Sequence, residues 1–282
     1  MNYYIIVGIL LVALVTVCIL SVSYHEPYNR SEIKFNNLPI VDKTTQYKHA
    51  KVLIFNSYAY SDKIPEYATH SSLITKAYAD NHGYDYKQYN HTPDIMPPYW
   101  LRVKDTYDVL MSGDYDVVMY LDLDATVHDF DLPINDVIAD NKYDFYIGAD
   151  PLGFDRPDFN NLVNTGCFIV KNTVWARLFI QMWMNACMNK DGNLSGICES
   201  SWKFIDKKWN CSDCKWAGLK YEQGALANLY IMNVNESRDH ICIFEESIMS
   251  NKFPEKKSYI LHLMGSTNNE RTKIFKNLAE LI

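Results

Sequence analysis

The sequence has no excess of positive charge, which bears on the partners it can bind. Its 282 residues include 27 Lys and Arg against 34 Asp and Glu, giving a formal net charge of −7, with no basic run and no evident stripe of aromatic and basic residues. Nucleic-acid binders carry a basic patch that meets phosphates, so no nucleic-acid partner is expected. Internal repeats and low-complexity tracts are also absent. An acidic protein with an anionic substrate needs local positive charge, which a bound cation would supply.

Cysteine is sparse, and the cysteines do not complete a zinc motif. Cys211-Ser212-Asp213-Cys214 has the spacing of a zinc knuckle, but no second C-x-x-C and no paired histidine supplies the remaining ligands. In an oxidising compartment, disulfides are the simpler interpretation. The spacing does not determine the pairing. Outside the N-terminal apolar segment the cysteines are Cys167, Cys187, Cys198, Cys211, Cys214 and Cys242.

Charged residues are missing from residues 3–22, which form an unbroken apolar segment of 20 residues. A helix needs about 20 residues to span a bilayer core, and the hydrophobic region of a signal peptide has only about 7–15. We therefore expect a retained transmembrane anchor, with cleavage after Ser21-Val22-Ser23 as the alternative. Residues 1–2 would be a short tail, residues 23–49 an irregular stem containing Pro27 and Pro39, and residues 50–282 one large domain.

No Lys or Arg precedes the apolar segment, so charge does not set its orientation. Glycosylation sequons lie only beyond it and fit a lumenal or extracellular body. We expect a single-pass type II membrane protein whose catalytic domain lies in the lumen of the Golgi or another secretory compartment. The sequon asparagines are Asn29, Asn90, Asn193, Asn210 and Asn235.

Strand and helix patterns alternate along the domain. Strands are expected at residues 51–57, 84–89 and 116–121, with helices at 65–81 and 99–112 between them. This order predicts a parallel sheet of the nucleotide-binding type. Glycine just beyond each helix marks its end. Further elements are expected as strands at 144–149, 164–170, 241–244 and 259–263, helices at 173–187 and 222–230, and an irregular region at 189–218.

A D-x-D motif follows the central strand. Residues 116–121 contain almost only β-forming apolar residues, as in a strand buried on both faces, and Asp122 and Asp124 come directly after it. Alternate residues of a strand share a face, so the two carboxylates should point one way and Leu123 the other. Ligands of open α/β sheets bind at the carboxyl ends of strands, and two oxygens there can hold a divalent cation that also touches a phosphate. A solvated acidic turn is the alternative.

Four short motifs follow one another along the chain: Asp122-Leu123-Asp124-Ala125, Asn164-Thr165-Gly166, Glu222-Gln223-Gly224-Ala225 and His262-Leu263-Met264-Gly265. The ordered set resembles the nucleotide-sugar glycosyltransferases of the GT-A fold, most closely family 34, with its plant xyloglucan xylosyltransferases and yeast galactosyl- and mannosyltransferases. The matching segments are YWLRVKDTYDVL, VVMYLDLDATVHDFDLPI, NTGCFIVKNTVWARLFIQMW, YEQGALANLY and ILHLMG.

This resemblance implies an α/β, GT-A (Rossmann-like) domain after the N-terminal transmembrane helix. Its implied activity is the transfer of a hexosyl or pentosyl group from a UDP- or GDP-sugar to the hydroxyl of a glycan or glycoprotein acceptor. Family members retain the anomeric configuration. No clear carboxylate nucleophile is present, which favours attack by the acceptor hydroxyl on the face that the nucleotide leaves.

The resemblance also assigns roles to matching positions. Asp122, Asp124 and His262 would hold Mn²⁺ or another divalent cation, for which oxygen and imidazole ligands are suited. Glu222 and Gln223 would lie near the anomeric carbon. The expected donor or substrate side comprises Arg102, Lys104, Leu123, Asn164, Thr165, Gly166 and Gly265.

Each of these roles has a structural alternative. His262 can be a core histidine at a strand end, and Asn164-Thr165-Gly166 a turn. Glu222 and Gln223 can simply favour the first turn of a helix. Arg102 and Lys104, which are placed near the donor phosphates by position alone, can face solvent.

One position departs from the family pattern. Family members commonly carry Lys two positions after the glycine matching Gly265, and this chain has Thr267 there. Arg271 or Lys273 is a possible substitute. Without one, donor binding would be weaker or different, so the identity of the donor is open.

Two functions of other classes remain. Asp122-Leu123-Asp124-Ala125-Thr126-Val127 also resembles the D-x-D-x-T-V motif of haloacid-dehalogenase phosphatases, with Asp150 and Asp155 as the late acidic pair. Asp150 and Asp155 follow the D-x-D motif too closely to leave room for a further βαβ unit of about 30 residues. In these phosphatases the D-x-D-x-T-V motif also normally lies at the start of the domain, unlike here. The other alternative is a non-catalytic lumenal binding domain in which the motifs are vestigial.

Overall fold

The computed structural model describes residues 47, 49–60, 63–140, 142–150, 162–189 and 192–282. The chain divides into two units, Met1–Phe35 and Asn36–Ile282, and every described residue belongs to the second. The predicted anchor at residues 3–22, nearly all of the predicted stem and Asn29 lie outside the described residues. Among the helices that are described, none combines the length and the apolar character needed to cross a bilayer.

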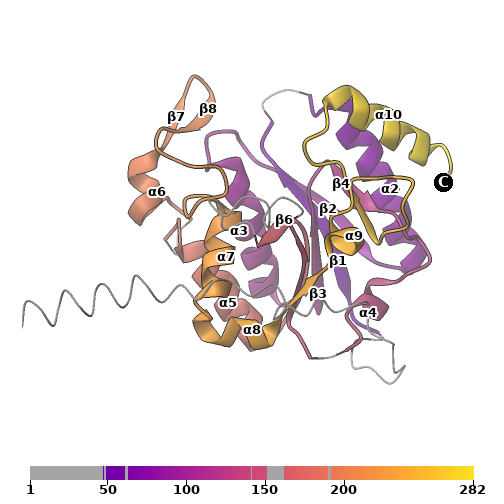
Figure 1. Cartoon of the computed structure of the whole chain (residues 1–282), viewed down its shortest axis with the longest axis horizontal. Helices are drawn as coiled ribbons and strands as arrows, with labels where there is room; N and C mark the ends of the chain where they lie inside the picture. The colour runs from indigo at the N-terminus through magenta and orange to yellow at the C-terminus, as the bar shows by residue number, and fades with distance from the viewer. Residues whose placement is uncertain (1–46, 48, 61–62, 141, 151–161, 190–191) are drawn as a thin grey trace, which may run out of the picture. The chain divides into compact units, whose positions relative to one another are not determined.

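A six-stranded sheet forms the centre of this unit, in the order β2-β1-β3-β6-β5-β9 (Figure 1). β1 pairs in parallel with both β2 and β3, as the β-α-β-α-β pattern predicts. β6 runs antiparallel to its neighbours β3 and β5, and β9 is parallel to β5, so the whole sheet is mixed. The strands are β1 (Val52–Tyr58), β2 (Asp85–Asn90), β3 (Val117–Leu121), β5 (Phe145–Ala149), β6 (Val163–Lys171) and β9 (Ile241–Phe244).

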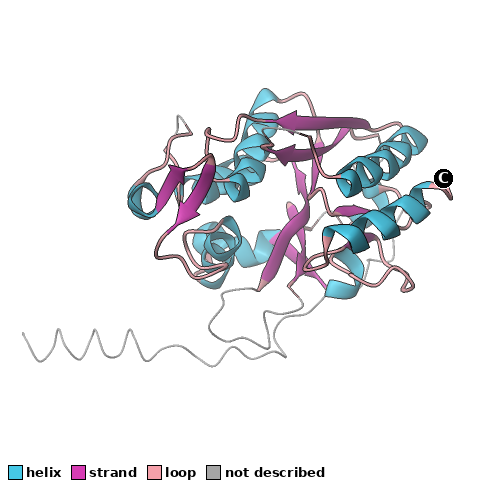
Figure 2. Ribbon diagram, turned by 90° about the horizontal axis from the view of Figure 1, so that it is seen from above, coloured by secondary structure: helices cyan, strands magenta, loops and turns pink. Residues whose placement is uncertain are grey.

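Helices cover both faces of the sheet. α3, α5 and α7 lie on one face and α2 and α10 on the other (Figure 1 and Figure 2). The side chains of β3 alternate between the two layers: Met119 packs in the cluster that holds Tyr78 of α2, whereas Tyr120 stacks on Phe168. This double burial explains the uninterrupted apolar run. These helices are α2 (Glu66–His82), α3 (Pro98–Ser112), α5 (Val174–Asn185), α7 (Glu222–Ile231) and α10 (Asn268–Ala279).

The helix ends follow the predicted signals. Gly83 and Gly113 end α2 and α3 at φ of 71° and 72°, a left-handed conformation that glycine adopts without steric cost. Thr173 caps α5, with its side chain accepting a hydrogen bond from the Ala176 amide at 3.1 Å. These local signals therefore position the helices as expected.

A second, two-stranded sheet was not predicted. It pairs β4 (Ala125–Val127) with β10 (Ile260–His262) in antiparallel register, with His262 opposite Ala125. The amide of Leu263 also donates to the carbonyl of Asp124 at 2.9 Å. This pairing places the end of β10, which is distant in the chain, next to the residues that follow β3.

We expected residues 189–218 to be irregular, but this region contains regular elements. It contains α6 (Gly196–Ser201) and a hairpin of β7 (Trp202–Ile205) and β8 (Lys208–Cys211). The hairpin turn at Asp206 and Lys207 has φ of 51° and 61°. Such two-residue turns are normally marked by Asn-Gly or Asp-Gly, and this one lacks glycine, so its signal is weak.

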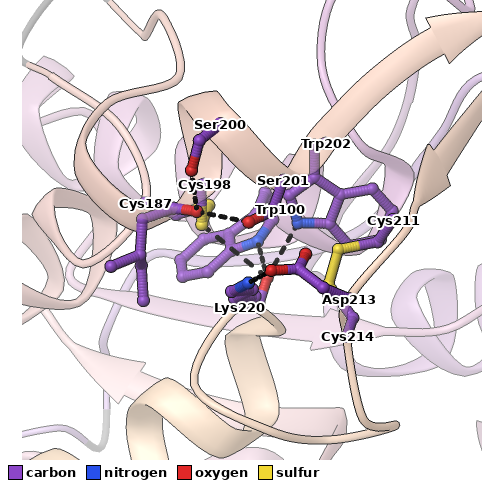
Figure 3. The surroundings of a disulfide bond; sticks show 11 residues. Trp100, Cys187, Cys198, Ser200, Ser201, Trp202, Cys211, Asp213, Cys214 and Lys220 are labelled. Atoms are coloured by element: carbon purple, nitrogen blue, oxygen red, sulfur yellow. Dashed lines mark hydrogen bonds and ion pairs between the residues drawn. A yellow bond between two sulfur atoms is a disulfide. The ribbon is translucent and has the colours of Figure 1, made fainter.

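Two disulfides brace this region and the helix before it (Figure 3). They join Cys187 to Cys198 and Cys211 to Cys214. Both sulfurs of the C-x-x-C pair belong to the second of these disulfides. Cys167 and Cys242 lie buried in β6 and β9. The remaining short helices are α4 (Ile134–Val137), η2 (Val234–Glu236), α8 (Ser237–His240) and α9 (Glu246–Met249).

Candidate active site

The D-x-D motif forms a tight turn directly after β3. The amide of Asp122 donates to the carbonyl of Gly166 at 2.7 Å, and the amide of Ala125 donates to the carbonyl of Asp122 at 3.0 Å. Leu123 turns into an apolar cluster with Leu261 and its neighbours. The two carboxylates consequently share a side and Leu123 points away, as expected, although the residues form a turn and not a continued strand.

Asp122, Asp124 and His262 converge. The Nε2 atom of His262 lies 3.4 Å from Oδ1 of Asp124 and 3.9 Å from Oδ2 of Asp122. One potential ligand atom from each residue lies within 4.8 Å of the others. His262 is buried, at 3% exposure, yet it faces the two acids and not an apolar core. The antiparallel pairing of β4 with β10 is what brings the ring to this place.

Two arginines hold the outer oxygens of the acid pair. Arg102 of α3 places Nη2 2.8 Å from Oδ1 of Asp122, and Arg271 of α10 places Nη2 2.6 Å from Oδ2 of Asp124. Each carboxylate thus uses one oxygen for an arginine and turns the other toward His262. Charge-assisted hydrogen bonds of this kind fix the orientation of a carboxylate. The inner oxygens are therefore available to a single cation.

Gly166 leaves the space in which these groups meet. A Cβ atom built at Gly166 would lie 2.1 Å from Cε1 of His262 and 2.9 Å from Oδ2 of Asp122. Nδ1 of His262 has no hydrogen-bond partner within the described part of the chain, so packing against Gly166 orients the ring. Two carboxylate oxygens and an imidazole nitrogen form a donor set that can hold a divalent cation. The residues present fit such a cation.

Burial and neighbouring charges shift the pKa values of Asp122, Asp124 and His262 in different directions. Burial, together with the neighbouring Asp124, raises the pKa of Asp122 in spite of Arg102. Burial would also raise the pKa of Asp124, but His262 and Arg271 lower it to about 2. Burial would lower the pKa of His262, but the two aspartates raise it. A divalent cation at this position would compete with protons for the same atoms.

Glu222 and Gln223, at the start of α7, meet Thr165 of β6. The Thr165 hydroxyl donates to Oε1 of Glu222 at 2.8 Å, and the Thr165 amide donates to Oε1 of Gln223 at 3.2 Å. Arg102 lies 3.6 Å from Glu222 and donates to the Thr165 carbonyl at 3.0 Å. Burial raises the pKa of Glu222. Gln223 Nε2 donates to Asp150 at 3.1 Å, so Asp150 belongs to this network.

Two cavities flank the acid pair. The smaller, of about 310 Å³, reaches His262, Glu222 and Gln223, and the larger, of about 550 Å³, opens toward β1 and the β7–β8 hairpin. Both are bordered by Asp122 and Asp124. The smaller cavity also contains Asn164, Thr165, Gly166, Gly265 and Arg102. The larger one is bordered by the aromatic residues Tyr58, Tyr60, Tyr67, Tyr99 and Trp209 and by Lys207 and Lys208.

Some predicted site residues lie elsewhere. Lys104 forms an ion pair with Asp108 one turn along α3 and borders a different cavity. The Leu123 side chain lies in the apolar cluster and touches only the edge of the larger cavity. Thr267, at the position where lysine is common in the resembling family, caps α10. Of its two suggested substitutes, Arg271 borders the smaller cavity and Lys273 is exposed.

The sequence alone missed several cavity residues. Tyr99 and Tyr221 are the first residues of two of the matching segments, so their position next to the motifs could have identified them as site residues. Trp216 and Met264 also border the smaller cavity. Trp216 belongs to the region expected to be irregular, and no sequence pattern connects it to the motifs. Asp155, one of the two residues of the phosphatase alternative, lies outside the described residues.

Comparison with known proteins gives a family and a fold. The sequence profile of the family described as nucleotide-diphospho-sugar transferase matches residues 66–276. A glycosyltransferase involved in the glycosylation of the major capsid of PBCV-1 superposes with a TM-score of 0.53 at 15% identity, over 80% of this chain and 99% of that one. The galactosyltransferase LgtC, solved with donor and acceptor sugar analogs, has a TM-score of 0.40 at 14% identity, over 82% and 96%. No curated protein matches the sequence.

Proposed function

Because this chain belongs to the nucleotide-diphospho-sugar transferase family and is a glycosyltransferase, we propose that it moves a hexosyl or pentosyl group from a UDP- or GDP-sugar to a glycan or glycoprotein hydroxyl. We place it near glycosyltransferase family 34. The observation that carries the proposal is the convergence of two carboxylates and an imidazole between two cavities. Family membership leaves no support for the phosphatase or the non-catalytic alternative.

The nucleotide fits the larger cavity. Aromatic rings provide faces for a base, and Lys207 and Lys208 provide positive charge for phosphates. The smaller cavity instead contains the amide and hydroxyl groups of Asn164, Thr165 and Gln223 and the carboxylate of Glu222, which match the hydroxyls of a sugar. The diphosphate would then cross between the cavities at the acid pair.

A divalent cation held by Asp122, Asp124 and His262 would offset the negative charge that develops on the departing diphosphate. Arg102 and Arg271 hold the outer carboxylate oxygens, so the inner ones keep their orientation during the reaction. Because the arginines balance the two aspartates, a cation bound between them would add positive charge beside the acid pair. This charge would attract the diphosphate.

We propose transfer with retention by front-face attack. The acceptor oxygen bonds to the anomeric carbon as the bond from that carbon to the phosphate oxygen breaks, with its electron pair, on the same face. The acceptor proton passes to the leaving phosphate oxygen. Gln223 and Glu222 lie where they can stabilise positive charge on the sugar. Oε1 of Glu222 is engaged by Thr165 and Arg102, whereas Oε2 has no hydrogen-bond partner among the described residues. A trapped covalent glycosyl-enzyme would contradict this mechanism.

We also propose that residues 3–22 anchor the protein, that residues 23–49 form a stem, and that the domain lies in the lumen of the Golgi or another secretory compartment. Two features support a lumenal domain. Disulfides persist in oxidising compartments, and this domain contains two. The sequon asparagines Asn90, Asn193, Asn210 and Asn235 are exposed. Carbonate extraction together with peptide N-glycosidase treatment tests this: an unglycosylated, extractable protein would contradict it.

The activity is tested by screening UDP- and GDP-sugars for hydrolysis by the detergent-solubilised full chain, with and without Mn²⁺. We expect hydrolysis of at least one donor only with the cation, and none by Asp124→Ala. Asp131→Ala is the matched control, because Asp131 is an exposed aspartate near Asp124 in sequence that borders neither cavity. Hydrolysis of p-nitrophenyl phosphate, or full activity in Asp124→Ala, would refute the proposal.

A further inference from the structure

An exposed tryptophan stands at the rim of the smaller cavity. Trp216 lies in the connection between β8 and α7 and is 52% exposed, yet it borders the cavity that contains Asp122 and Gln223. Its ring packs edge-to-face against Tyr99 at 5.4 Å and Tyr221 at 5.1 Å between ring centroids. A large aromatic side chain that is half exposed at a cavity marks a surface for a ligand.

The loop that carries Trp216 is held at both ends (Figure 3). On one side, the disulfide between Cys211 and Cys214 ties it to β8. On the other, the carbonyl of Lys220 accepts hydrogen bonds from the indole N–H groups of Trp100 at 3.1 Å and Trp202 at 3.0 Å. The ammonium of Lys220 also pairs with the Asp213 carboxylate. The exposed ring of Trp216 therefore lies on a segment that is held in place at both ends.

The same loop lies directly on the helix that carries Glu222 and Gln223. A Cβ atom at Gly224 would lie 2.0 Å from the carbonyl oxygen of Ala217 and 2.4 Å from that of Gly218, so only glycine permits this contact. Trp216, next to Ala217, is therefore fixed in relation to the first turn of α7. A ring placed in this way can orient a ligand with respect to Glu222 and Gln223.

We propose that Trp216 is the platform on which the acceptor sugar stacks. This inference rests on the proposed function and names a class of acceptor: a hexopyranose with one continuous C–H face, such as a β-glucopyranosyl or β-galactopyranosyl unit. The apolar face of such a ring covers the exposed indole and leaves its hydroxyls at the edge. An aromatic ring recognises that face through apolar burial and the charge distribution of its π system.

The acceptor fits this position better than the nucleobase does. The smaller cavity contains no lysine, and its two arginines, Arg102 and Arg271, are already paired with Asp122 and Asp124. The lysines that suit phosphates, Lys207 and Lys208, border the other cavity. Entry past Trp216 also leads toward Glu222 and Gln223, where the anomeric carbon is proposed to lie.

The test compares Trp216→Ala and Trp216→Phe with wild-type full-length protein in detergent. Leu219→Ala is the matched control, because Leu219 lies on the same loop, is 45% exposed and borders neither cavity. The acceptor probes are methyl β-D-glucopyranoside, methyl β-D-galactopyranoside, cellobiose and lactose. Transfer from the donor that the wild type hydrolyses is measured, with acceptor KM, donor KM and acceptor-free hydrolysis determined separately. Binding of each probe is also followed by quenching of tryptophan fluorescence.

For Trp216→Ala we expect kcat/KM for the acceptor to fall about 10–100-fold, as for a buried aromatic contact in a binding site. Donor KM and acceptor-free hydrolysis should change much less than the acceptor kcat/KM, because the nucleotide is proposed to lie in the larger cavity, which Trp216 does not border. Trp216→Phe should restore most of the transfer, and Leu219→Ala should resemble the wild type. Folding of Trp216→Ala is judged by its melting curve. If it does not fold, quenching of tryptophan fluorescence by the probes is compared between the wild type and Trp216→Phe, in which it should be lost.

Three results would overturn the inference: unchanged acceptor KM in Trp216→Ala, a rise in donor KM instead, or a hydrolysing wild type that neither binds nor uses any probe. Absence of donor hydrolysis in the wild type would instead refute the proposed function. In that case, quenching of Trp216 fluorescence by the glycosides, lost in Trp216→Phe, still decides whether the platform exists.

Discussion

Replacing Gly166 by alanine should expel His262 from the acid pair. The added Cβ would lie 2.1 Å from Cε1 and 2.8 Å from Nε2 of the ring, whereas carbon atoms in contact are normally about 3.5–4.0 Å apart. The ring must therefore retreat by more than about 1 Å, since β6 pairs with β3 up to Cys167 and the Gly166 carbonyl accepts a hydrogen bond from the Asp122 amide. Metal ligands tolerate deviations of only about 0.2 Å.

The expected result is a loss of Mn²⁺ affinity of at least about 10–100-fold, which is the usual effect of disturbing residues that orient a metal ligand. Isothermal titration and electron paramagnetic resonance of free Mn²⁺ measure it directly, without any substrate. The fold should survive, because Gly166 does not have the positive φ that disfavours alanine.

Gly83→Ala is a control that should destabilise the fold and leave the metal site unchanged. A Cβ there meets nothing within 4 Å, but φ is 71°, so alanine is strained in the left-handed region. We expect it to lose about 1–2 kcal/mol of stability and to bind Mn²⁺ like the wild type. In a His262→Ala background, Gly166→Ala should weaken binding no further. Wild-type affinity in a folded Gly166→Ala protein would refute the role of His262 as a ligand.

Three further changes test the packing around the site and away from it. Arg102→Met should lower the free energy of unfolding by about 3–5 kcal/mol, since it removes the arginine that pairs with Asp122 and with the buried Glu222. Urea denaturation showing a loss below about 1 kcal/mol would contradict the network. Burial lowers the pKa of Lys171 from 10.5 to about 8. Between these two pH values the unfolded chain binds a proton that the folded chain lacks, so the wild type gains stability as pH rises. Lys171→Met lacks this titrating group, so its stability relative to the wild type should fall as pH rises from about 8 to about 10.5. A difference in stability that is independent of pH would contradict the lowered pKa. Serine at both Cys187 and Cys198, which close a loop with a sequence separation of 11, should cost about 3 kcal/mol under oxidising conditions, and an equal melting temperature for variant and oxidised wild type would argue against that disulfide.

Local signals in the sequence predicted much of the first half of the domain. Strand and helix periods gave β1, α2, β2, α3 and β3 to within a few residues, and Gly83 and Gly113 marked the ends of two helices. The D-x-D motif at the end of a buried strand pointed to the site. These features depend on the residues of one segment and on whether each side chain is buried, so they can be inferred one segment at a time.

Other features depend on the pairing of segments that are distant in the chain. The register of β10 against β4 puts His262 beside the acid pair, and a shift of one residue would turn its ring to the other face. The antiparallel direction of β6, the left-handed turn at Lys207 without glycine, and the position of Trp216 at the cavity are likewise results of packing.

By itself the sequence determined the strands and helices of the first half of the domain and the motifs that stand at their ends, because backbone preference and burial pattern are local. It also determined the set of carboxylates, imidazole and amides from which a site could be built. Only the tertiary structure decided that Arg102 and Arg271 take the outer oxygens of Asp122 and Asp124 while His262 faces the inner ones. Those contacts join four separate parts of the chain, and the pairing and packing of the whole domain, not any one segment, select them.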